Sequence, residues 1–152
     1  MTCYPKFVMS DAELAPKEHL EMIQAVINRM GSNSFAVRTW SVGLVAALLA
    51  FAADRGATPW RVLVALVPVV TFWYLDAYYL RQERLFRRLY DAVRLGEASA
   101  RENGVFSMNT TPYAAEPYNK LSAAFWSTTV RTLYLALFVI VLAAYAVAKA
   151  KG

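Results

Sequence analysis

The sequence predicts an all-α membrane protein with three transmembrane helices, an N-terminal amphipathic helix and a long cytoplasmic extension of the second span. Three observations support this fold class. Hydrophobic residues make up 58% of the 152 residues and charged residues 18%, whereas soluble domains average about 45–50% and about 25%. Charged residues are absent from three stretches, 39–53, 62–75 and 132–148. The four Trp, at positions 40, 60, 73 and 126, fall near the ends of these stretches, as aromatic belts require.

The first element is an amphipathic helix before the first span. Its apolar residues recur at three- and four-residue steps, and Gly31 with residues 32–34 is expected to end it and form a turn. Its polar face carries as many acids as bases, which favours packing against another protein helix over lying in the lipid headgroups. The apolar positions are Leu20, Ile23, Val26, Ile27 and Met30.

Each uncharged stretch needs a few flanking residues to reach the roughly 20 that a bilayer-spanning helix requires. The predicted order is therefore a cytoplasmic N-terminal segment 1–34, first span 35–54, periplasmic turn 55–60, second span 61–80, cytoplasmic stem helix 81–101, cytoplasmic loop 102–120, interfacial helix with third span 121–148, and tail 149–152.

The distribution of Lys and Arg predicts the orientation. Basic residues are concentrated before the first span and between the second and third spans, so the positive-inside rule places the N-terminus in the cytoplasm and the C-terminus in the periplasm of a bacterial inner membrane. Lys149 and Lys151 oppose this assignment. A re-entrant third helix that returns the tail to the cytoplasm stays open as the alternative.

The stem helix continues the second span without Gly or Pro until Gly96. An alternating four-three spacing along it predicts a heptad-like seam, which can pair with the N-terminal amphipathic helix within a subunit or between subunits. The seam positions are Leu75, Tyr79, Gln82, Phe86, Leu89 and Val93. Acids interleave with the stem arginines and predict i,i+4 pairs at Glu83/Arg87, Arg87/Asp91 and Glu97/Arg101. A solvated, salt-bridged face is favoured over lipid contact, and nucleic acid is not expected as a partner.

Asp76 is the most informative polar residue, because a carboxylate near the end of a span is costly without a partner. Counting from the hairpin midpoint places Arg38 at the same height, and Arg131 lies near that level. We expect Asp76 to pair with Arg38 or Arg131 and so to set helix register. A gate or ion-path role, or simple contact with interfacial water, is the alternative.

Small residues and one proline predict how the spans pack. Gly43 with Ala47, and Ala46 with Ala50, are spaced four apart and allow close approach of another helix. Pro68 removes one backbone hydrogen bond in the second span and predicts a kink there, either a static bend or a hinge.

No enzyme motif is present. Cys3 and His19 are the single cysteine and histidine, and neither stands in a nucleophile, phosphate-loop or metal-ligand pattern. The sequence therefore predicts no catalysis, no metal and no cofactor.

The segments HLEMIQAVINRMGSNSF and FWYLDAYYLRQERLFRRLYDAVR resemble the RipA family of small bacterial inner-membrane proteins. The resemblance implies a three-span protein assembled as a symmetric homo-oligomer, reported for the family as an octamer, and it implies no biochemical activity. The matched stem positions are Asp76, Tyr79, Arg81, Glu83, Arg84 and Arg88.

Two functions follow as hypotheses. The first is a homo-oligomeric membrane scaffold, a stress- or virulence-related assembly whose cytoplasmic helical ring recruits a protein partner. The second is an oligomeric pore that conducts ions or small solutes. The expected partners are further copies of the chain, membrane lipids and a cytoplasmic protein. The near absence of polar residues within the spans argues against a permanently water-filled channel.

Overall fold

The computed structural model describes residues 11–54, 58–98, 100, 104 and 106–151, and every regular element within them is a helix. The elements are α1 (Asp11–Asp54), α2 (Pro59–Leu63), α3 (Leu66–Leu95), the 3₁₀ helices η1 (Thr111–Tyr113) and η2 (Pro117–Asn119), α5 (Leu121–Phe125) and α6 (Thr128–Lys151). The predictions concerning Cys3, residues 55–57 of the turn and Arg101 lie outside the described residues.

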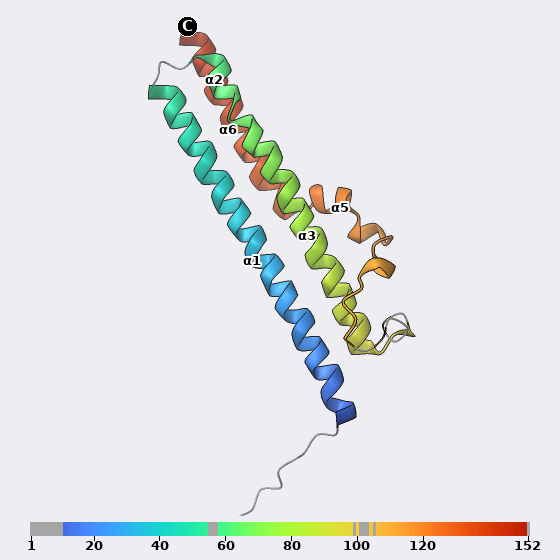
Figure 1. Cartoon of the computed structure of the whole chain (residues 1–152). Helices are drawn as coiled ribbons and strands as arrows, with labels where there is room; N and C mark the ends of the chain where they lie inside the picture. The colour runs from blue at the N-terminus through green and yellow to red at the C-terminus, as the bar shows by residue number, and fades with distance from the viewer. Residues whose placement is uncertain (1–10, 55–57, 99, 101–103, 105, 152) are drawn as a thin grey trace, which may run out of the picture.

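The helices form an elongated bundle. Figure 1 shows α1 and α3 running antiparallel along each other, with α6 beside α2 and the first part of α3. Three described segments are long and apolar enough to span a membrane, namely Lys17–Ala53, Pro59–Leu95 and Thr128–Ala150. The all-helical fold class with three such helices is therefore confirmed for the described part of the chain.

α1 runs through the predicted boundary at residue 34, so the expected turn at 32–34 is wrong. The helix has 44 residues and is about 66 Å long at 1.5 Å per residue. Gly31 is half-buried, and a Cβ placed there would lie 4.0 Å from Glu83 Oε2. A glycine inside a helix costs about 1 kcal/mol. Packing against α3 along both halves of α1 outweighs that cost, because helical stability in proteins comes mainly from tertiary packing.

Pro68 interrupts the second span one turn before its own position. α2 ends at Leu63, and Val64 and Ala65 form a turn before α3 begins at Leu66. Pro68 has no N–H to offer the carbonyl of Val64, and its ring crowds that carbonyl. The Val64 oxygen instead accepts a hydrogen bond from Val67 N–H at 3.1 Å. Pro68 is therefore preceded by a short break with 3₁₀-type bonding, and a bend of the helix at this point stays a prediction.

The stem ends earlier than the predicted residue 101. α3 stops at Leu95, and Gly96 has the left-handed φ of 66°. The Glu97 N–H donates to the Ala92 carbonyl at 2.9 Å and the Gly96 N–H donates to the Val93 carbonyl at 3.2 Å. This is the Schellman pattern, which closes a helix at a glycine.

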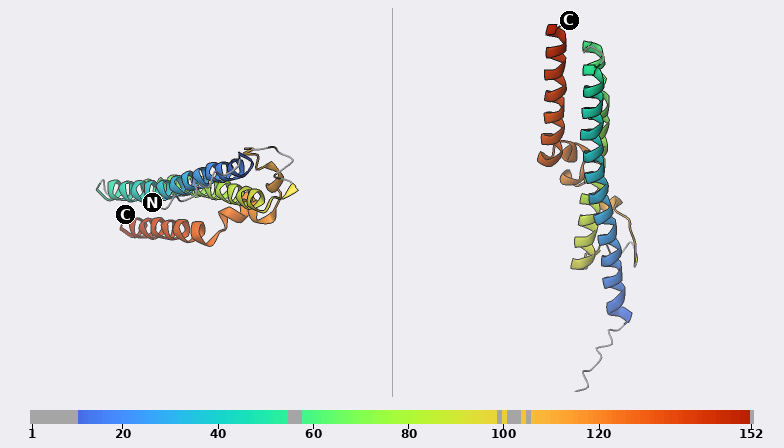
Figure 2. Two further views of the ribbon diagram at one scale, coloured as in Figure 1. Left: turned by 90° about the horizontal axis from the view of Figure 1, so that it is seen from below. Right: turned by 90° about the vertical axis from the view of Figure 1, so that its left-hand side faces the viewer.

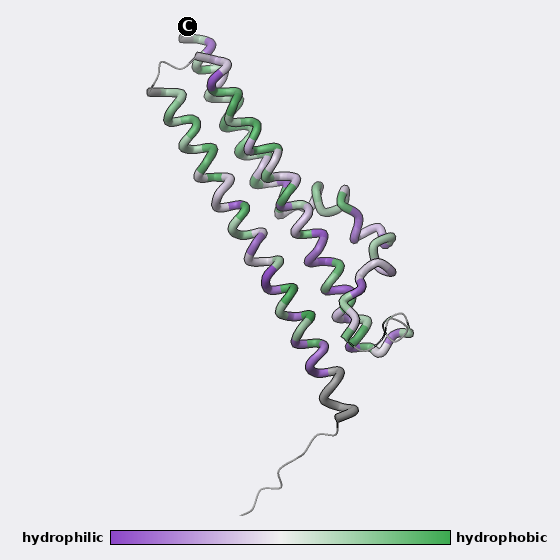
Figure 3. Tube along the Cα trace, viewed as in Figure 1, coloured by the Kyte–Doolittle hydropathy of each residue, from purple (hydrophilic) through white to green (hydrophobic). Residues whose placement is uncertain are grey.

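The two halves of the bundle have different compositions. Figure 3 shows hydrophobic residues along the half where α1, α2, α3 and α6 lie together, and alternating polar residues along the opposite half. Figure 2 shows that α1 and α3 continue past the beginning of α6 into this second half. We call residues 34–54, 58–76 and 128–151 the apolar half, and residues 17–33, 77–95 and 106–120 the charged half.

Each half has its own core. In the apolar half, Val45 and Ala52 of α1 pack with Val69 of α3 and Val141 of α6. In the charged half, the core joins α1, α3 and η1, and its buried members are Ile23, Ile27, Leu85, Leu89, Ala92, Ala100 and Tyr113. The amphipathic face of the N-terminal segment is therefore covered by the stem of the same chain, which was one of the two open alternatives.

The contacting face of the stem is shifted from the predicted seam. Leu85, Leu89 and Ala92 are buried, whereas Phe86 and Val93 are half-buried at the edge of the cluster and Leu89 alone belongs to both sets. The seam prediction assumed a strict heptad. The straight α-helix has 3.6 residues per turn rather than 3.5, which moves the buried stripe around the helix as it proceeds.

Candidate functional site

The first candidate site is a buried ion pair where the two halves meet. The Asp76 side chain is fully buried in α3, and Arg38 Nε of α1 donates to its Oδ2 at 2.8 Å. Arg38 Nη2 lies 3.3 Å from Asp76 Oδ1, and the Ser34 hydroxyl donates to that same oxygen. The carboxylate thus accepts three hydrogen bonds from one face of α1, which satisfies a charge that would otherwise be very costly at this position.

Helix periodicity explains why these groups meet. Ser34, Arg38 and Ser41 are spaced i, i+4 and i+7 and share one face of α1. Of the two guanidinium groups expected near Asp76, Arg38 is the one in contact. Arg131 lies exposed on α6, and none of the ion pairs between described residues joins it to Asp76.

An aromatic stack connects this level to α5 and α6. The ring of Trp73, one turn before Asp76, stacks on Phe125 at 4.5 Å and on Tyr134 at 6.0 Å between centroids. Trp73 Nε1 donates to the Phe125 carbonyl at 3.2 Å. Tyr134 is fully buried in α6. The three spans are therefore held in register at one level by a polar pair and an aromatic stack.

The second candidate site is an arginine clamp in the charged half. Arg81, Arg84 and Arg88 repeat at i, i+3 and i+7 along one face of α3 and hold the segment 113–119 against the helix. Arg81 Nε donates to the Asn119 carbonyl at 3.0 Å, and Arg84 Nη1 donates to the Tyr118 carbonyl at 3.1 Å. The Arg84 guanidinium also lies 4.1 Å from the Tyr118 ring centroid, a cation–π distance.

Arg88 is the centre of the clamp. It donates two hydrogen bonds to Glu97, at 3.0 and 2.9 Å, and one to Glu116 Oε1 at 3.1 Å. The hydrogen bonds to Glu97 and then to Glu116 raise the pKa of Arg88 above its usual range, and the Arg88 hydrogen bond lowers the pKa of Glu97. The Arg88 guanidinium also lies 5.0 Å from the ring centroid of buried Tyr113.

The other predicted stem residues have different positions. Tyr79 is half-buried and its ring meets Tyr78 edge-on at 5.8 Å. Glu83 pairs with Arg87 at 2.6 Å, as the spacing suggested. The expected Arg87/Asp91 pair is absent from the ion pairs of the described residues, because Arg87 is engaged by Glu83 and Asp91 pairs with Arg94 at 3.4 Å.

The expectation of a solvated, salt-bridged arginine face describes three of the arginines only in part. Arg81, Arg84 and Arg88 contact the segment after the stem, which was expected to be a plain loop or a partner site. Arg81 and Arg84 use the backbone carbonyls of Asn119 and Tyr118, whose positions no residue pattern reveals. Tyr113 and Glu116, which contact Arg88 through their side chains, were missed because they lie far from it in the sequence. The signal that could have found them is the cluster of two prolines and two tyrosines at 112–118 opposite a regular arginine spacing.

His19 closes the far end of the charged half. It is 5% exposed, its Nε2 lies 2.9 Å from the Ser107 carbonyl, and its ring is 5.7 Å from that of Phe106. Gly104 at φ 87° and Phe106 at φ 64° turn the chain back toward α1 at this point. The described residues contain no group of three or more His, Cys, Asp or Glu side chains arranged for a metal ion.

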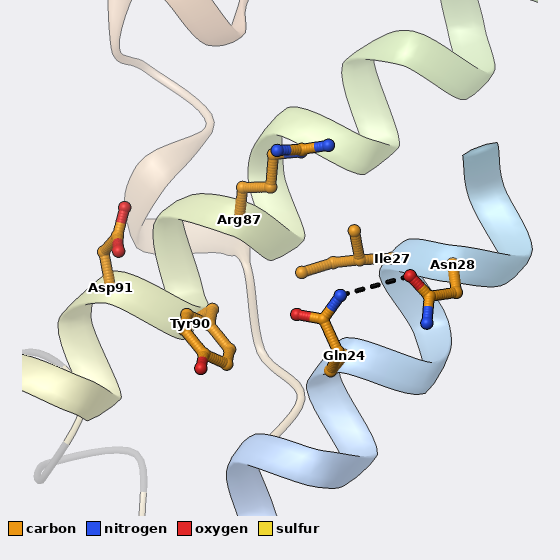
Figure 4. A pocket seen from close by; sticks show the side chains of 6 residues that line it. All are labelled: Gln24, Ile27, Asn28, Arg87, Tyr90 and Asp91. Atoms are coloured by element: carbon orange, nitrogen blue, oxygen red, sulfur yellow. Dashed lines mark hydrogen bonds between the residues drawn. The ribbon is translucent and has the colours of Figure 1, made fainter.

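A polar cleft of about 320 Å³ lies between α1 and α3 in the charged half. Figure 4 shows Ile27 at its base, Gln24 facing Tyr90 across it and the Arg87 guanidinium at one end, while Asp91 points away. Gln24 Nε2 donates to Asn28 Oδ1 at 3.1 Å. The polar groups around the cleft are thus largely engaged with neighbours on their own helices.

The small residues of α1 lie on the surface of the folded chain. Gly43, Ala46, Ala47 and Ala50 are all exposed, and a Cβ at Gly43 would meet nothing within 4 Å. Packing with α3 and α6 uses Val45 and Ala52 on another face. The small-residue face therefore makes no close helix contact within the described chain, and its predicted role in close helix packing stays a prediction.

Neither a family model, nor a curated protein, nor a solved structure matches this chain, and its resemblance to the RipA family stays a prediction.

Proposed function

We propose that this chain is a non-catalytic, homo-oligomeric scaffold of the bacterial inner membrane. In this proposal the apolar half spans the bilayer, and copies associate through the exposed small-residue face of α1. The charged half then stands in the cytoplasm and presents a helical ring to protein partners. The observation that carries the proposal is the exposed face of Gly43, Ala46, Ala47 and Ala50 on α1, a helix whose Val45 and Ala52 are already buried in the core of the same chain.

The physical chemistry of the bilayer favours a second helix packed against that face. Lipid chains are as apolar as Leu, so helices gain little by burying large apolar residues against each other in a membrane. They gain by close backbone contact, for which small residues spaced four apart are the recurring solution. Elsewhere on the apolar half of α1, large side chains such as Phe51, at 58% exposure, are suited to lipid.

The charged half supports a scaffold role. Its core, the arginine clamp and the His19 contact hold three segments together, and a rigid surface loses little conformational entropy when a partner binds. The RipA resemblance adds the expectation of an octamer. A particle of eight times the 17.0 kDa chain mass would agree with it.

The test uses Gly43→Leu in the full chain. The side chain enters open space in one subunit, so the monomer keeps its fold and any effect reports another molecule. Overpacking a close contact costs about 1–3 kcal/mol, which is about 5- to 150-fold in a dissociation constant. We expect mass photometry in detergent to show a shift from oligomer to monomer.

The matched control is Val139→Leu, a small enlargement at a 63% exposed position of α6, which should leave the oligomer intact. Wild-type protein that is monomeric at all concentrations, or an oligomer that tolerates Gly43→Leu, would contradict the proposed interface.

The pore hypothesis has less support. The hydroxyls of Thr39, Thr71 and Thr132, three exposed polar side chains of the apolar half, donate to their own helix backbone at Phe35, Val67 and Thr128. An axis lined by any exposed face of α1, α3 or α6 would thus be mostly apolar and would resist wetting. Ion flux into liposomes that scales with protein and is altered by Thr71→Leu would favour the pore over the scaffold.

A further inference from the structure

A groove lies at the hairpin end of the apolar half, between the last turns of α1 and the short helix α2. Its volume is about 180 Å³, and its lining is almost entirely apolar. We call it the hairpin groove. The lining residues are Leu48, Phe51, Ala52, Trp60, Arg61 and Val64.

The groove opens toward the surroundings of the bundle. Phe51, Trp60 and Val64 on its walls are 58%, 65% and 43% exposed, while Ala52 at its base is buried. It lies where the last turns of α1 pass α2, just before the break in hydrogen bonding between α2 and α3. In a membrane-spanning bundle these exposed walls face the bilayer.

Trp60 and Arg61 show at which depth the groove ends. Trp is enriched where the hydrocarbon meets the headgroups, and Arg61 Cζ lies 5.8 Å from the centroid of the Trp60 ring. Val64 and Leu48 lie one turn deeper. One end of the groove thus carries a guanidinium at headgroup depth, and the other extends into the hydrocarbon.

The shape and the charge both select the occupant. A helix with its side chains is about 10–12 Å wide and does not enter a recess of this size, whereas a single acyl chain does. Figure 1 shows the end of α6 beside α2. Among the side chains that the structure describes in 58–61 and 149–150, Arg61 and Lys149 are basic and none is acidic.

We infer that the hairpin groove binds one acyl chain of an anionic phospholipid whose phosphate contacts the Arg61 guanidinium. Arg matches phosphate oxygens in a bidentate geometry that an amide side chain lacks. This inference goes beyond the scaffold role, because it requires a membrane-spanning chain but no oligomer.

The experiment titrates the purified full chain in detergent with phosphatidylglycerol or with phosphatidylcholine of the same acyl chains, and native mass spectrometry counts the bound lipids. Arg61→Gln should weaken phosphatidylglycerol binding about fivefold, the contribution of one basic residue near an anionic surface, and leave phosphatidylcholine unchanged. Arg29→Gln, at an exposed position of the charged half, is the matched control and should leave both affinities unchanged.

A second pair of variants tests the apolar part. Val64→Trp fills the groove from its exposed wall and should weaken both lipids, whereas Val70→Trp, at a 57% exposed position outside the groove, should weaken neither. Three results would overturn the inference. The first is equal affinity of the wild type for both lipids, and the second is equal phosphatidylglycerol affinity of Arg61→Gln and Arg29→Gln. The third is a Val64→Trp variant that loses oligomer mass while its number of bound lipids is unchanged. The last result would assign the groove to a second copy. Oligomer mass is read from the same spectra, so failure of the scaffold proposal is seen separately.

Discussion

Replacing Arg38 by Met is the most direct test of the buried ion pair. The substitution keeps an unbranched side chain of similar length and removes both N–H donors to Asp76. Asp76 then keeps one hydrogen bond, from Ser34, and its carboxylate side chain is 0% exposed. The carboxylate is therefore left as a buried charge without a counter-ion.

The expected cost follows from this geometry. Removing one partner of a buried pair typically costs about 3–5 kcal/mol, whereas replacing both partners by apolar residues of similar volume is often neutral or stabilising. Arg38→Met should thus lower the free energy of unfolding by about 3–5 kcal/mol. The double variant Arg38→Met/Asp76→Leu should recover most of this loss, to within about 1 kcal/mol of the wild type. The residual loss is the hydrogen bond that Ser34 no longer makes to Asp76.

The assay is reversible unfolding in mixed micelles with increasing dodecyl sulfate, followed by the fluorescence of the four Trp, of which Trp73 lies one turn from Asp76. Arg29→Met, at an exposed position of the same helix, should change stability by no more than about 0.5 kcal/mol. The reasoning is refuted if Arg38→Met costs less than about 1 kcal/mol, or if the double variant is no more stable than Arg38→Met.

Two further predictions concern the arginine clamp. Arg88→Gln should release the segment 113–119, and hydrogen exchange of the amides in this segment should become at least about tenfold faster. The control Arg87→Gln removes only the pair with Glu83 and should leave that exchange unchanged. Equal effects of the two variants would contradict the clamp. The pKa of Glu97 is lower in the folded chain than its usual 4.5. Below about pH 4.5 the unfolded chain therefore binds more protons than the folded chain. The stabilisation by Glu97 is complete above about pH 4.5 and is lost as the pH falls through the folded pKa. Exchange in 113–119, corrected for its intrinsic pH dependence, should therefore accelerate on acidification below about 4.5, and Glu97→Gln should reduce this pH dependence; an identical pH profile in the variant would contradict the assignment.

The fold was predictable where one residue pattern had one physical solution. Long uncharged stretches flanked by Trp can be satisfied only by helices in lipid, and the three apolar helices follow. The height of Asp76 relative to Arg38 could be counted, because a hairpin of two helices has a fixed rise per residue. Pro68 predicted its break, because proline removes a defined hydrogen bond.

The remainder depended on contacts between distant segments. Gly31 and Ser34 have the local signature of a helix end, but Ser34 contacts Asp76 and Gly31 faces α3, and these tertiary contacts outweigh local propensity. Two contacts of the clamp use the carbonyls of Tyr118 and Asn119, and backbone acceptors are the same in every residue type. The third joins Arg88 to Glu116, 28 residues away in the sequence. The exposed face around Gly43 shows that a small-residue pattern indicates close packing without saying which helix packs there.

The continuity of α1 has a mechanical consequence. The side of α1 that bears Gly43 and Ala47 and the side that bears Ile23 and Ile27 belong to one hydrogen-bonded helix with no break between them. Such a helix resists torsion, so turning one end about its axis turns the other by nearly the same angle. Copies that pack through α1 would therefore fix the rotational orientation of each charged half about the α1 axis, as well as its position. A change in how the copies meet within the bilayer would then be transmitted as a rotation of the surface offered to partners.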